Sequence, residues 1–127
     1  MAYSHFFIIF ITMYRYNAKL DRVVDGDTID ALVDLGFNTW KKVRIRMMGI
    51  NAPESRTRDL EEKKLGLAAK ARLIELIESN DFLFTLKSHG VGKFGRCLGE
   101  IFIEEEISIN QTLINEGHAT QYNGGTK

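Results

Sequence analysis

Apolar and polar residues alternate in three consecutive segments between residues 14 and 48, and this alternation most restricts how the chain can fold. A period of two places one face of an extended segment in a core and the other face in solvent. Turn signals separate the segments, with Asp25-Gly26 after the first and Gly36 after the second. The sequence therefore predicts three successive strands. Their apolar faces consist of Tyr14, Tyr16, Ala18 and Leu20, then Ile29, Ala31, Val33 and Leu35, then Val43, Ile45 and Met47.

A segment of helical period follows at residues 59–79. Asp59 and Glu62 resemble a capping box, which marks the first turn of a helix, and Asn80 ends the pattern. We expect the apolar side of this amphipathic helix to face the strands. That side is predicted to consist of Leu60, Leu67, Ala71, Ile74 and Glu78, with Ala68 and Ile77 beside them.

Two more strands are predicted in the second half of the chain. Phe82, Phe84 and Leu86 alternate with polar or intervening positions and mark the fourth strand. Residues 88–95 contain three glycines and read as a loop, and residues 96–103 form the fifth strand.

A second capping box, Ser108 with Gln111, begins a short helix that stops at Gly117. The order of elements is therefore β-β-β-α-β-β-α. This order predicts a mainly β fold with some α (α+β): a small five-stranded barrel with one helix between strands three and four and a short C-terminal helix.

Length and charge limit the functions that this fold can serve. With 127 residues, the chain has room for one domain and one core. Lys and Arg number 17 and Asp and Glu number 17, so bulk positive charge cannot hold a nucleic acid. Contact with a polyanion would require a local basic patch or a metal ion. The single cysteine, Cys97, excludes an intrachain disulfide and a zinc site built from cysteines.

The two ends of the chain are distinct from the predicted domain, which we assign to residues 13–122. Residues 1–12 form an apolar extension and residues 123–127 a flexible tail. The apolar run at 6–11 is too short to span a bilayer, which takes about 20 residues, and it lacks the basic start and cleavage site of a signal peptide. A degenerate export signal, an extra strand and an upstream start codon all stay open for this run, and the sequence assigns no location.

Asp25 and Asp27 bracket Gly26 and place two carboxylates close together. Two such charges repel by about 1 kcal/mol at about 4 Å in water, and a bound cation would turn this cost into a gain. Carboxylate oxygens suit Ca²⁺ or Mg²⁺. An Asx turn, in which one Asp caps a backbone amide, explains the same motif without a metal, so the motif alone leaves both explanations open.

Three further charged residues lie near the ends of predicted strands. Arg46 is on the polar face of the third strand, and Arg96 follows a glycine-containing turn. Arginine suits bidentate contact with phosphate. Glu54 follows Pro53, whose fixed backbone angle stiffens the turn. Each has an ordinary explanation as a surface charge, but adjacent strand ends would let them converge with Asp27 at one mouth of the barrel.

Four segments, taken together, carry a family resemblance. They are VVDGDTI at 23–29, VRIRMMGINAPE at 43–54, GKFGR at 92–96 and INQTLINEGHA at 109–119. In order and spacing they resemble the staphylococcal nuclease (thermonuclease) family, over roughly residues 14–122. The resemblance implies an OB-fold barrel with Ca²⁺-dependent phosphodiesterase activity on DNA and RNA, giving 3′-phosphate and 5′-hydroxyl ends.

The resemblance also implies a role for each matching residue. Asp27 corresponds to the principal calcium carboxylate, and Asp25 to a residue in the outer shell of the metal site. Glu54 corresponds to the general base, and Arg46 and Arg96 to the two side chains that hold the scissile phosphate. The remaining implied roles are metal ligation by Asn51 and by the backbone carbonyl of Ala52, and substrate binding by Lys93, Phe94 and Tyr122.

The sequence departs from the family pattern at three of these positions. Asn51 stands where the best-known members have a second calcium-binding Asp, so we expect weaker calcium binding. Ala52 replaces a Thr that ligates through its backbone, which leaves the ligand in place, and Phe94 replaces a Tyr.

Two functions that involve nucleic acid follow as hypotheses, beside a plain structural or interaction domain in which nucleic-acid binding depends on none of the four residues Asp27, Arg46, Glu54 and Arg96. The first is a monomeric nuclease that binds one Ca²⁺ and hydrolyses DNA or RNA without spanning a membrane. The second is a catalytically weak or inactive nuclease-like OB-fold module that binds nucleic acid, and Asn51 motivates it. Cleavage in the presence of calcium separates the two.

Overall fold

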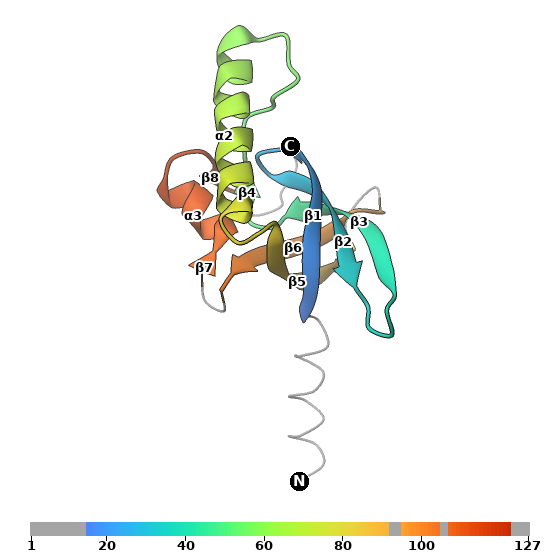
Figure 1. The fold of residues 1–127 in the computed structure, drawn as a ribbon. Helices are drawn as coiled ribbons and strands as arrows, with labels where there is room; N and C mark the ends of the chain where they lie inside the picture. The colour runs from blue at the N-terminus through green and yellow to red at the C-terminus, as the bar shows by residue number, and fades with distance from the viewer. Residues whose placement is uncertain (1–14, 92–94, 105–106, 123–127) are drawn as a thin grey trace.

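The computed structural model describes residues 15–91, 95–104 and 107–122, and at its centre five strands form a closed barrel (Figure 1). The strands pair in the order β3-β2-β1-β5-β6, and a parallel pairing between β3 and β6 closes the barrel. The predicted five-stranded barrel, mainly β with some α, is confirmed. Its strands are β1 (Arg15–Asp25), β2 (Thr28–Asp34), β3 (Trp40–Met47), β5 (Leu83–Val91) and β6 (Cys97–Ile103).

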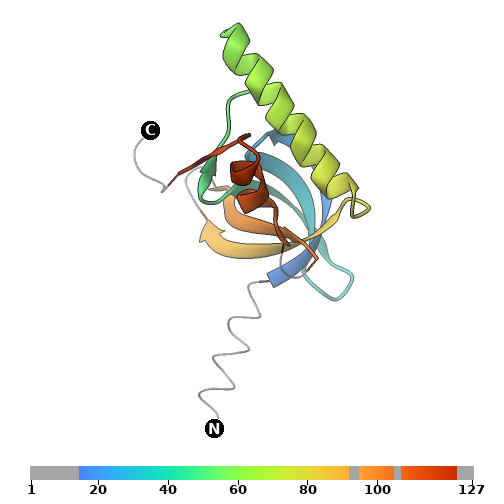
Figure 2. The ribbon, with the colours of Figure 1, turned by 90° about the vertical axis from the view of Figure 1, so that its left-hand side faces the viewer.

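Two helices and three short strands complete the described fold. Figure 2 shows α2 (Leu60–Glu78) running along one side of the barrel, with its first turns extending beyond the strands. Helix α3 (Ile109–Asn115) packs beside β6. Both helices lie where the sequence predicts them, and none in the described part combines the length and apolar character needed to cross a membrane. The two-residue strands, which were not predicted, are β4 (Ile50–Asn51), β7 (Ile107–Ser108) and β8 (Thr120–Gln121).

The alternating segments form the core as predicted, with one exception. Ile29, Ala31 and Ile45 are fully buried. Of their polar neighbours, Thr28 and Asp30 on β2 are buried too, whereas Arg44 on β3 is exposed. The prediction that Leu35 belongs to the core is wrong, because the residue is 46% exposed. Strand β2 ends one residue earlier, at Asp34, where its carboxylate accepts a hydrogen bond from the backbone N–H of Gly36 at 2.8 Å. The turn therefore begins before Leu35 can reach the core.

Helix α2 begins as predicted but buries a different face. The carboxylate of Asp59 accepts hydrogen bonds from the backbone N–H groups of Glu61 and Glu62, which caps the first turn. The predicted apolar side is wrong at Leu60, which is 79% exposed, and at Leu67, which is 48% exposed, whereas Ile77 is buried as predicted. Small residues on the buried face let the helix backbone approach the barrel closely. The prediction relied on large apolar residues and so did not include these small ones. The buried face consists of Gly66, Ala69, Leu73 and Ile77.

Strand β5 is longer than the sequence predicts. The expected loop at 88–95 begins within it, because β5 continues to Val91 and pairs there with Cys97. An irregularity between Ser88 and Val91 in the pairing with β6 explains why the alternation fades there. Residues 1–14, 92–94 and 123–127 lie outside the described residues, so the predicted extension and tail are not described.

Candidate active site

The turn between β1 and β2 carries Asp25 and Asp27 and is pressed against two other segments. A Cβ atom added to Gly26 would lie 2.7 Å from the Cβ of Ala69 on α2 and 3.0 Å from the Cβ of Ala52. Side-chain carbons do not approach one another this closely without movement. Glycine is therefore required between the two carboxylates so that the helix, the turn and the segment around Ala52 can meet.

The carboxylate of Asp27 is buried and held from several sides. One oxygen, Oδ1, accepts a hydrogen bond from the hydroxyl of Thr28 at 2.9 Å. The other, Oδ2, accepts one from the backbone N–H of Ala52 at 2.9 Å and lies 3.6 Å from Nη2 of Arg46. The residue is 8% exposed. These contacts fix the orientation of a negative charge at the end of the barrel and bring three predicted site residues together.

The guanidinium of Arg46 lies beside Asp27 and is itself mostly buried. It leaves β3 opposite Thr28, and its Nη1 donates to the backbone carbonyl of Met47 at 2.8 Å. Its side chain is 14% exposed. The guanidinium carbon lies 5.9 Å from the centre of the Tyr122 ring, a cation–π arrangement. The structure thus places Tyr122, which was predicted to bind substrate, next to the predicted phosphate-binding arginine.

The segment from Asn51 to Ser55 borders this buried cluster. Asn51 lies in β4 and pairs with Thr120 of β8, and Ala52 is buried. Glu54, two residues later, is exposed to solvent. Ser55 is again buried, at 2% exposure, and both its backbone N–H and its hydroxyl donate to the carboxylate of Asp25. The exposed carboxylate of Glu54 is therefore flanked along the chain by two buried residues, Ala52 and Ser55.

Ser55 is a site residue that the sequence reasoning missed. Its partner Asp25 was predicted to lie in the outer shell of a metal, and that role stays a prediction. The structure shows instead a direct contact that spans thirty positions of the chain, with the backbone N–H of Ser55 3.1 Å from Oδ1 of Asp25. No local pattern around Ser55 signals it, because a serine after a glutamate in a loop is ordinary.

Arg96 precedes the strand that closes the barrel. It follows Gly95, which has a φ of +72°, and comes just before the pair Ile45–Cys97 that joins β3 and β6. Arg46 follows the same pair on β3 and aligns with Leu98, so in this parallel register Arg96 precedes the level of Arg46 by two residues. Lys93 and Phe94 lie outside the described residues.

The donor set predicted for a metal consists of oxygens alone. Asp27 contributes a carboxylate, Asn51 an amide oxygen and Ala52 a backbone carbonyl, and such hard ligands fit Ca²⁺ or Mg²⁺ with water completing the coordination. Among the described residues, no group of three or more His, Cys, Asp or Glu side chains could hold a metal ion. Within the predicted set, Asp27 is the one charged ligand, and Asn51 and Ala52 would add uncharged oxygens.

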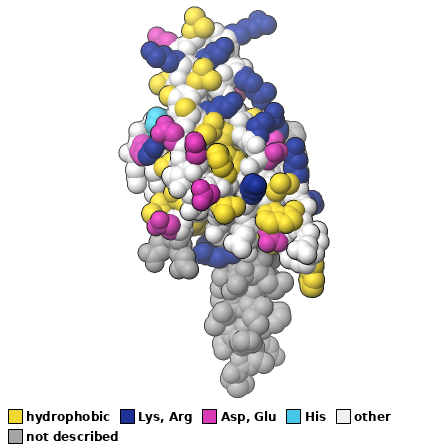
Figure 3. Space-filling model, in the orientation of Figure 1, with side chains coloured by type: hydrophobic (Ala, Val, Ile, Leu, Met, Phe, Trp, Pro, Cys, Tyr) yellow, Lys and Arg dark blue, Asp and Glu magenta, His cyan; other side chains and the backbone are white. Residues whose placement is uncertain are grey.

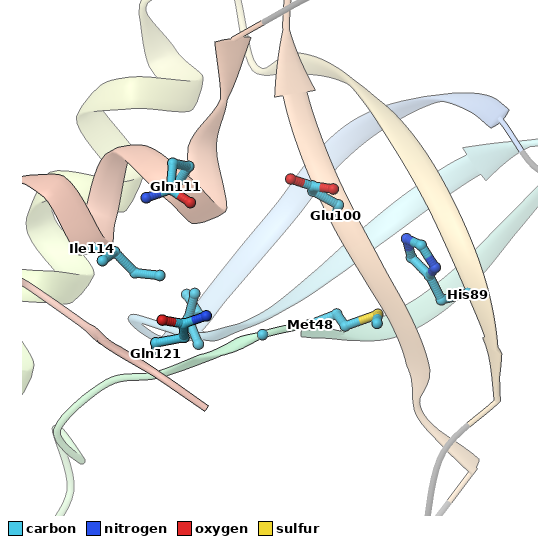
Figure 4. Close-up of a pocket in the computed structure, with 8 residues that line it drawn as sticks. Met48, His89, Glu100, Gln111, Ile114 and Gln121 are labelled. Atoms are coloured by element: carbon cyan, nitrogen blue, oxygen red, sulfur yellow. The ribbon is translucent and has the colours of Figure 1, made fainter. Parts of the chain in front are cut away.

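A cavity of about 250 Å³ lies next to the site and shares its edge. The backbone N–H of Tyr122 donates to the carbonyl of Gly49 at 2.9 Å, and Gly49 is part of the cavity wall. Figure 4 shows Glu100 and His89 on neighbouring strands, with Gln111 and Ile114 of α3 across from them. Among the described residues, none of those predicted for the site lines this cavity. Its wall consists of Met48, Gly49, Ile50, His89, Glu100, Gln111, Ile114 and Gln121.

Charges of opposite sign are partly separated on the surface although the chain as a whole is neutral. Figure 3 shows Lys and Arg gathered over the upper half of α2 and along one edge of the molecule, whereas Asp and Glu lie mainly over the middle of that face. Arg56 and Arg58, which follow Glu54 closely, are exposed. Local positive groups therefore exist beside the site despite the zero net charge.

Comparison with known proteins finds a matching family and several relatives. The family described as staphylococcal nuclease homologue matches residues 44–127. The chain is 30% identical over 110 residues to Protein ParB of Escherichia coli, 31% over 114 residues to Endonuclease YhcR of Bacillus subtilis, and 30% over 115 residues to a micrococcal nuclease of Shigella flexneri. These matches cover 80%, 85% and 84% of the chain. They span only 54%, 9% and 59% of the three relatives. The family match covers well over half of the chain, and on this ground the chain belongs to the staphylococcal nuclease homologue family.

Proposed function

We propose that this protein is a metal-dependent nuclease that hydrolyses phosphodiester bonds in DNA or RNA. The observation that carries the proposal is the buried contact between Asp27, Arg46 and the backbone of Ala52, with exposed Glu54 two residues further on. A guanidinium, a fixed carboxylate and a water-accessible carboxylate are groups that can together promote phosphodiester hydrolysis. Relatives named as nucleases support the same activity.

Arg46 and Arg96 are proposed to hold the scissile phosphate. Attack on the phosphorus builds negative charge on the phosphoryl oxygens, and a guanidinium offers several N–H donors in one plane. Arg46 is held in position by its contacts with Asp27 and the carbonyl of Met47, so little reorganisation is needed when charge develops. Removal of one such donor costs about 2.7–4 kcal/mol of transition-state stabilisation.

Glu54 is proposed to accept a proton from the attacking water. Its side chain is exposed, so water reaches it, and Pro53 before it restricts the backbone. A positioned general base contributes about 10²–10⁴-fold to the rate. This role requires the carboxylate to stand at a fixed place relative to the phosphate-binding arginines.

Asp27, Asn51 and the backbone carbonyl of Ala52 are proposed to hold one Ca²⁺. When bound there, a hard divalent cation supplies Lewis-acid stabilisation of a phosphoryl oxygen. Asn51 contributes no charge to this set, so we expect calcium to bind more weakly than at a site with two carboxylates. The proposed products carry 3′-phosphate and 5′-hydroxyl ends, and the protein acts as a monomer.

Cleavage of a fluorescently labelled single-stranded DNA oligonucleotide, and of the RNA of the same sequence, tests the proposal. We expect cleavage in Ca²⁺ that stops when a chelator is added and that falls sharply in Glu54→Gln. Glu61→Gln, which neutralises an exposed carboxylate on the first turn of α2, is the matched control and should cleave like the parent. Glu54→Gln cutting as fast as the parent would contradict the assigned base.

The competing function is an OB-fold module that binds nucleic acid without cutting it. The single carboxylate in the predicted metal set favours it, because Asn51 lowers the charge available to a cation. In the same assay this module would bind the labelled oligonucleotide tightly, as measured by fluorescence anisotropy. It would leave the oligonucleotide intact in Ca²⁺, Mg²⁺ and Mn²⁺ alike.

A further inference from the structure

Gly66 lies in the interior of α2, where glycine is unfavourable, and it is buried. A Cβ atom at this position would overlap the carbonyl group of Glu54, with the carbonyl carbon only 2.5 Å away, and would lie 2.7 Å from the backbone nitrogen of Ser55. Backbone atoms cannot swing aside as the end of a flexible side chain can. The missing side chain of Gly66 therefore leaves the space in which the backbone of Glu54 rests.

The end of β1 holds the same stretch of backbone. Oδ1 of Asp25 accepts hydrogen bonds from the backbone N–H of Ser55, at 3.1 Å, and from the Ser55 hydroxyl. Ser55 is 2% exposed, so solvent does not compete strongly for these bonds. Glu54, whose own side chain is exposed, is thus anchored by its backbone and by its neighbour.

Helix α2 also contacts the turn that carries the buried carboxylate. One turn after Gly66, the Cβ of Ala69 would lie 2.7 Å from a Cβ at Gly26, the residue just before Asp27. Two small positions on one helix face therefore touch the two segments that bear Asp27 and Glu54. A helix is stiff over one turn, so it can fix the spacing between these segments.

We infer that Gly66, Ser55 and Asp25 are positioning residues for Glu54, with α2 as the common support of the two carboxylate-bearing segments. The inference rests on the proposed function, in which Glu54 must stand at a fixed distance from the phosphate. In this inference the role of Asp25 is to hold Ser55 in place. The consequence is that a change on the helix should alter catalysis through Glu54 without touching the substrate.

The first test is Gly66→Ala, measured on a single-stranded DNA oligonucleotide in Ca²⁺. A displacement of about 1 Å at a reacting group can cost about 10²-fold in rate, so we expect kcat to fall about 100-fold with KM within about threefold of the parent. Ala68→Gly, at an exposed position of the same helix, is the control and should lower the melting temperature without lowering kcat. Parental kcat in Gly66→Ala would overturn the inference.

A double-mutant cycle shows whether the effect passes through the glutamate. In a Glu54→Gln background, Gly66→Ala should lower kcat by less than about threefold, because the group that it displaces is already inactive. If both losses simply multiply, Gly66 acts by some other route and the positioning role fails. This comparison also separates a local shift from general loss of structure, which would lower activity in both backgrounds.

Milder variants keep the inference testable if Gly66→Ala does not fold. Ser55→Ala removes one hydroxyl and should lower kcat about tenfold, with Ser55→Thr recovering part of it. Asp25→Asn keeps an acceptor oxygen for Ser55 but loses the charge. We expect it to lose less kcat than Asp25→Ala and to need the same Ca²⁺ concentration for half-maximal activity. A clear rise in that concentration would assign Asp25 to the metal site instead.

Hydrogen–deuterium exchange tests the contacts without requiring activity. The Ser55 amide should exchange at least about tenfold faster in Asp25→Ala and in Gly66→Ala than in the parent, while β2 amides keep their protection. If the parent never cleaves nucleic acid, the proposed function fails, yet this result would still support the anchoring. Unchanged exchange at Ser55 in both variants would overturn the anchoring itself.

Discussion

The two halves of the candidate site are held in different ways. In the buried half, Asp27 and Arg46 are fixed by contacts of their own side chains with the hydroxyl of Thr28 and with backbone groups. In the exposed half, Glu54 reaches solvent, and only its backbone and its neighbour Ser55 are anchored. Groups that bind charge gain from a fixed, water-poor setting, whereas a base that takes a proton from water must meet water. The difference predicts that the halves respond differently to substitution.

Substitution in the exposed half should cost activity and almost no stability. Glu54→Gln is expected to lower kcat by about 10²–10⁴-fold, because the amide cannot accept the proton. The free energy of unfolding should stay within about 0.5 kcal/mol of the parent, since the side chain is exposed. Urea unfolding of both proteins, together with single-turnover cleavage, checks this. A large loss of stability would show that the carboxylate has structural contacts and would break the distinction.

Substitution in the buried half should lower both activity and stability. Arg46→Lys is expected to lower kcat by about 10²–10³-fold, because an ammonium cannot reproduce the planar fork that holds phosphate. It should also lower the free energy of unfolding by about 1–2 kcal/mol, since the contacts with Asp27 and the Met47 carbonyl are weakened. Arg44→Lys, two residues away on the same strand, is the matched control. It should keep kcat within about threefold of the parent.

Asp30 is a buried carboxylate outside the candidate site, and it can be compared with Asp27 inside the site. Hydrogen bonds from Arg44, at 2.8 and 3.1 Å, hold the pKa of Asp30 below its usual value, with smaller contributions from the charges of Arg44, Arg22 and Lys42. Its folded pKa is lower than its unfolded pKa, so Asp30 adds stability at pH values above about 4. That stability is lost as the pH falls further, through the lowered pKa of the folded state.

The measurement for Asp30 is urea unfolding of the parent and of Asp30→Asn at pH 7 and near pH 3. At pH 7 the variant should be less stable by about 1–3 kcal/mol, and the gap should shrink at the lower pH. Cleavage at pH 7 should be unaffected by this substitution. An Asp30→Asn variant that lost its activity while staying folded would extend the functional site along β2 and β3.

The smallest effect is expected at Cys97, which follows Arg96. Burial raises the pKa of its thiol, and a contact with the Ser88 hydroxyl, at 3.6 Å, offsets part of this rise. The thiolate is the reactive form, so iodoacetamide at pH 8 should label the folded protein at least about tenfold more slowly than the urea-unfolded protein. Cys97→Ala should keep kcat within about twofold of the parent. Rapid labelling in the folded state would mean that the start of β6 opens readily.

The sequence predicts the barrel better than it predicts how the site is supported. Alternation identifies Ile29, Ala31 and Ile45 as core residues because a strand repeats its environment every second residue. The face of α2 was predicted wrongly because Gly66 and Ala69 carry almost no hydrophobic signal, although they make the closest approach. The contact of Ser55 with Asp25 joins distant segments, and local patterns contain no information about such pairs. The roles of Asp27, Arg46, Glu54 and Arg96 stay predictions until they are measured.

The parallel pairing of β3 with β6 also has a kinetic consequence. Arg46 and Arg96 are each next to a member of the pair Ile45–Cys97. Ile45 precedes α2 in the chain and Cys97 follows it. Pairings between distant segments form late, because the entropy of closing the intervening loop is lost before the contacts are gained. A chain that has folded its first three strands would carry one of the two arginines in place. With the phosphate-binding roles proposed for both arginines, the complete site would form only when β6 closes the barrel, and a partly folded chain would lack one of the two groups.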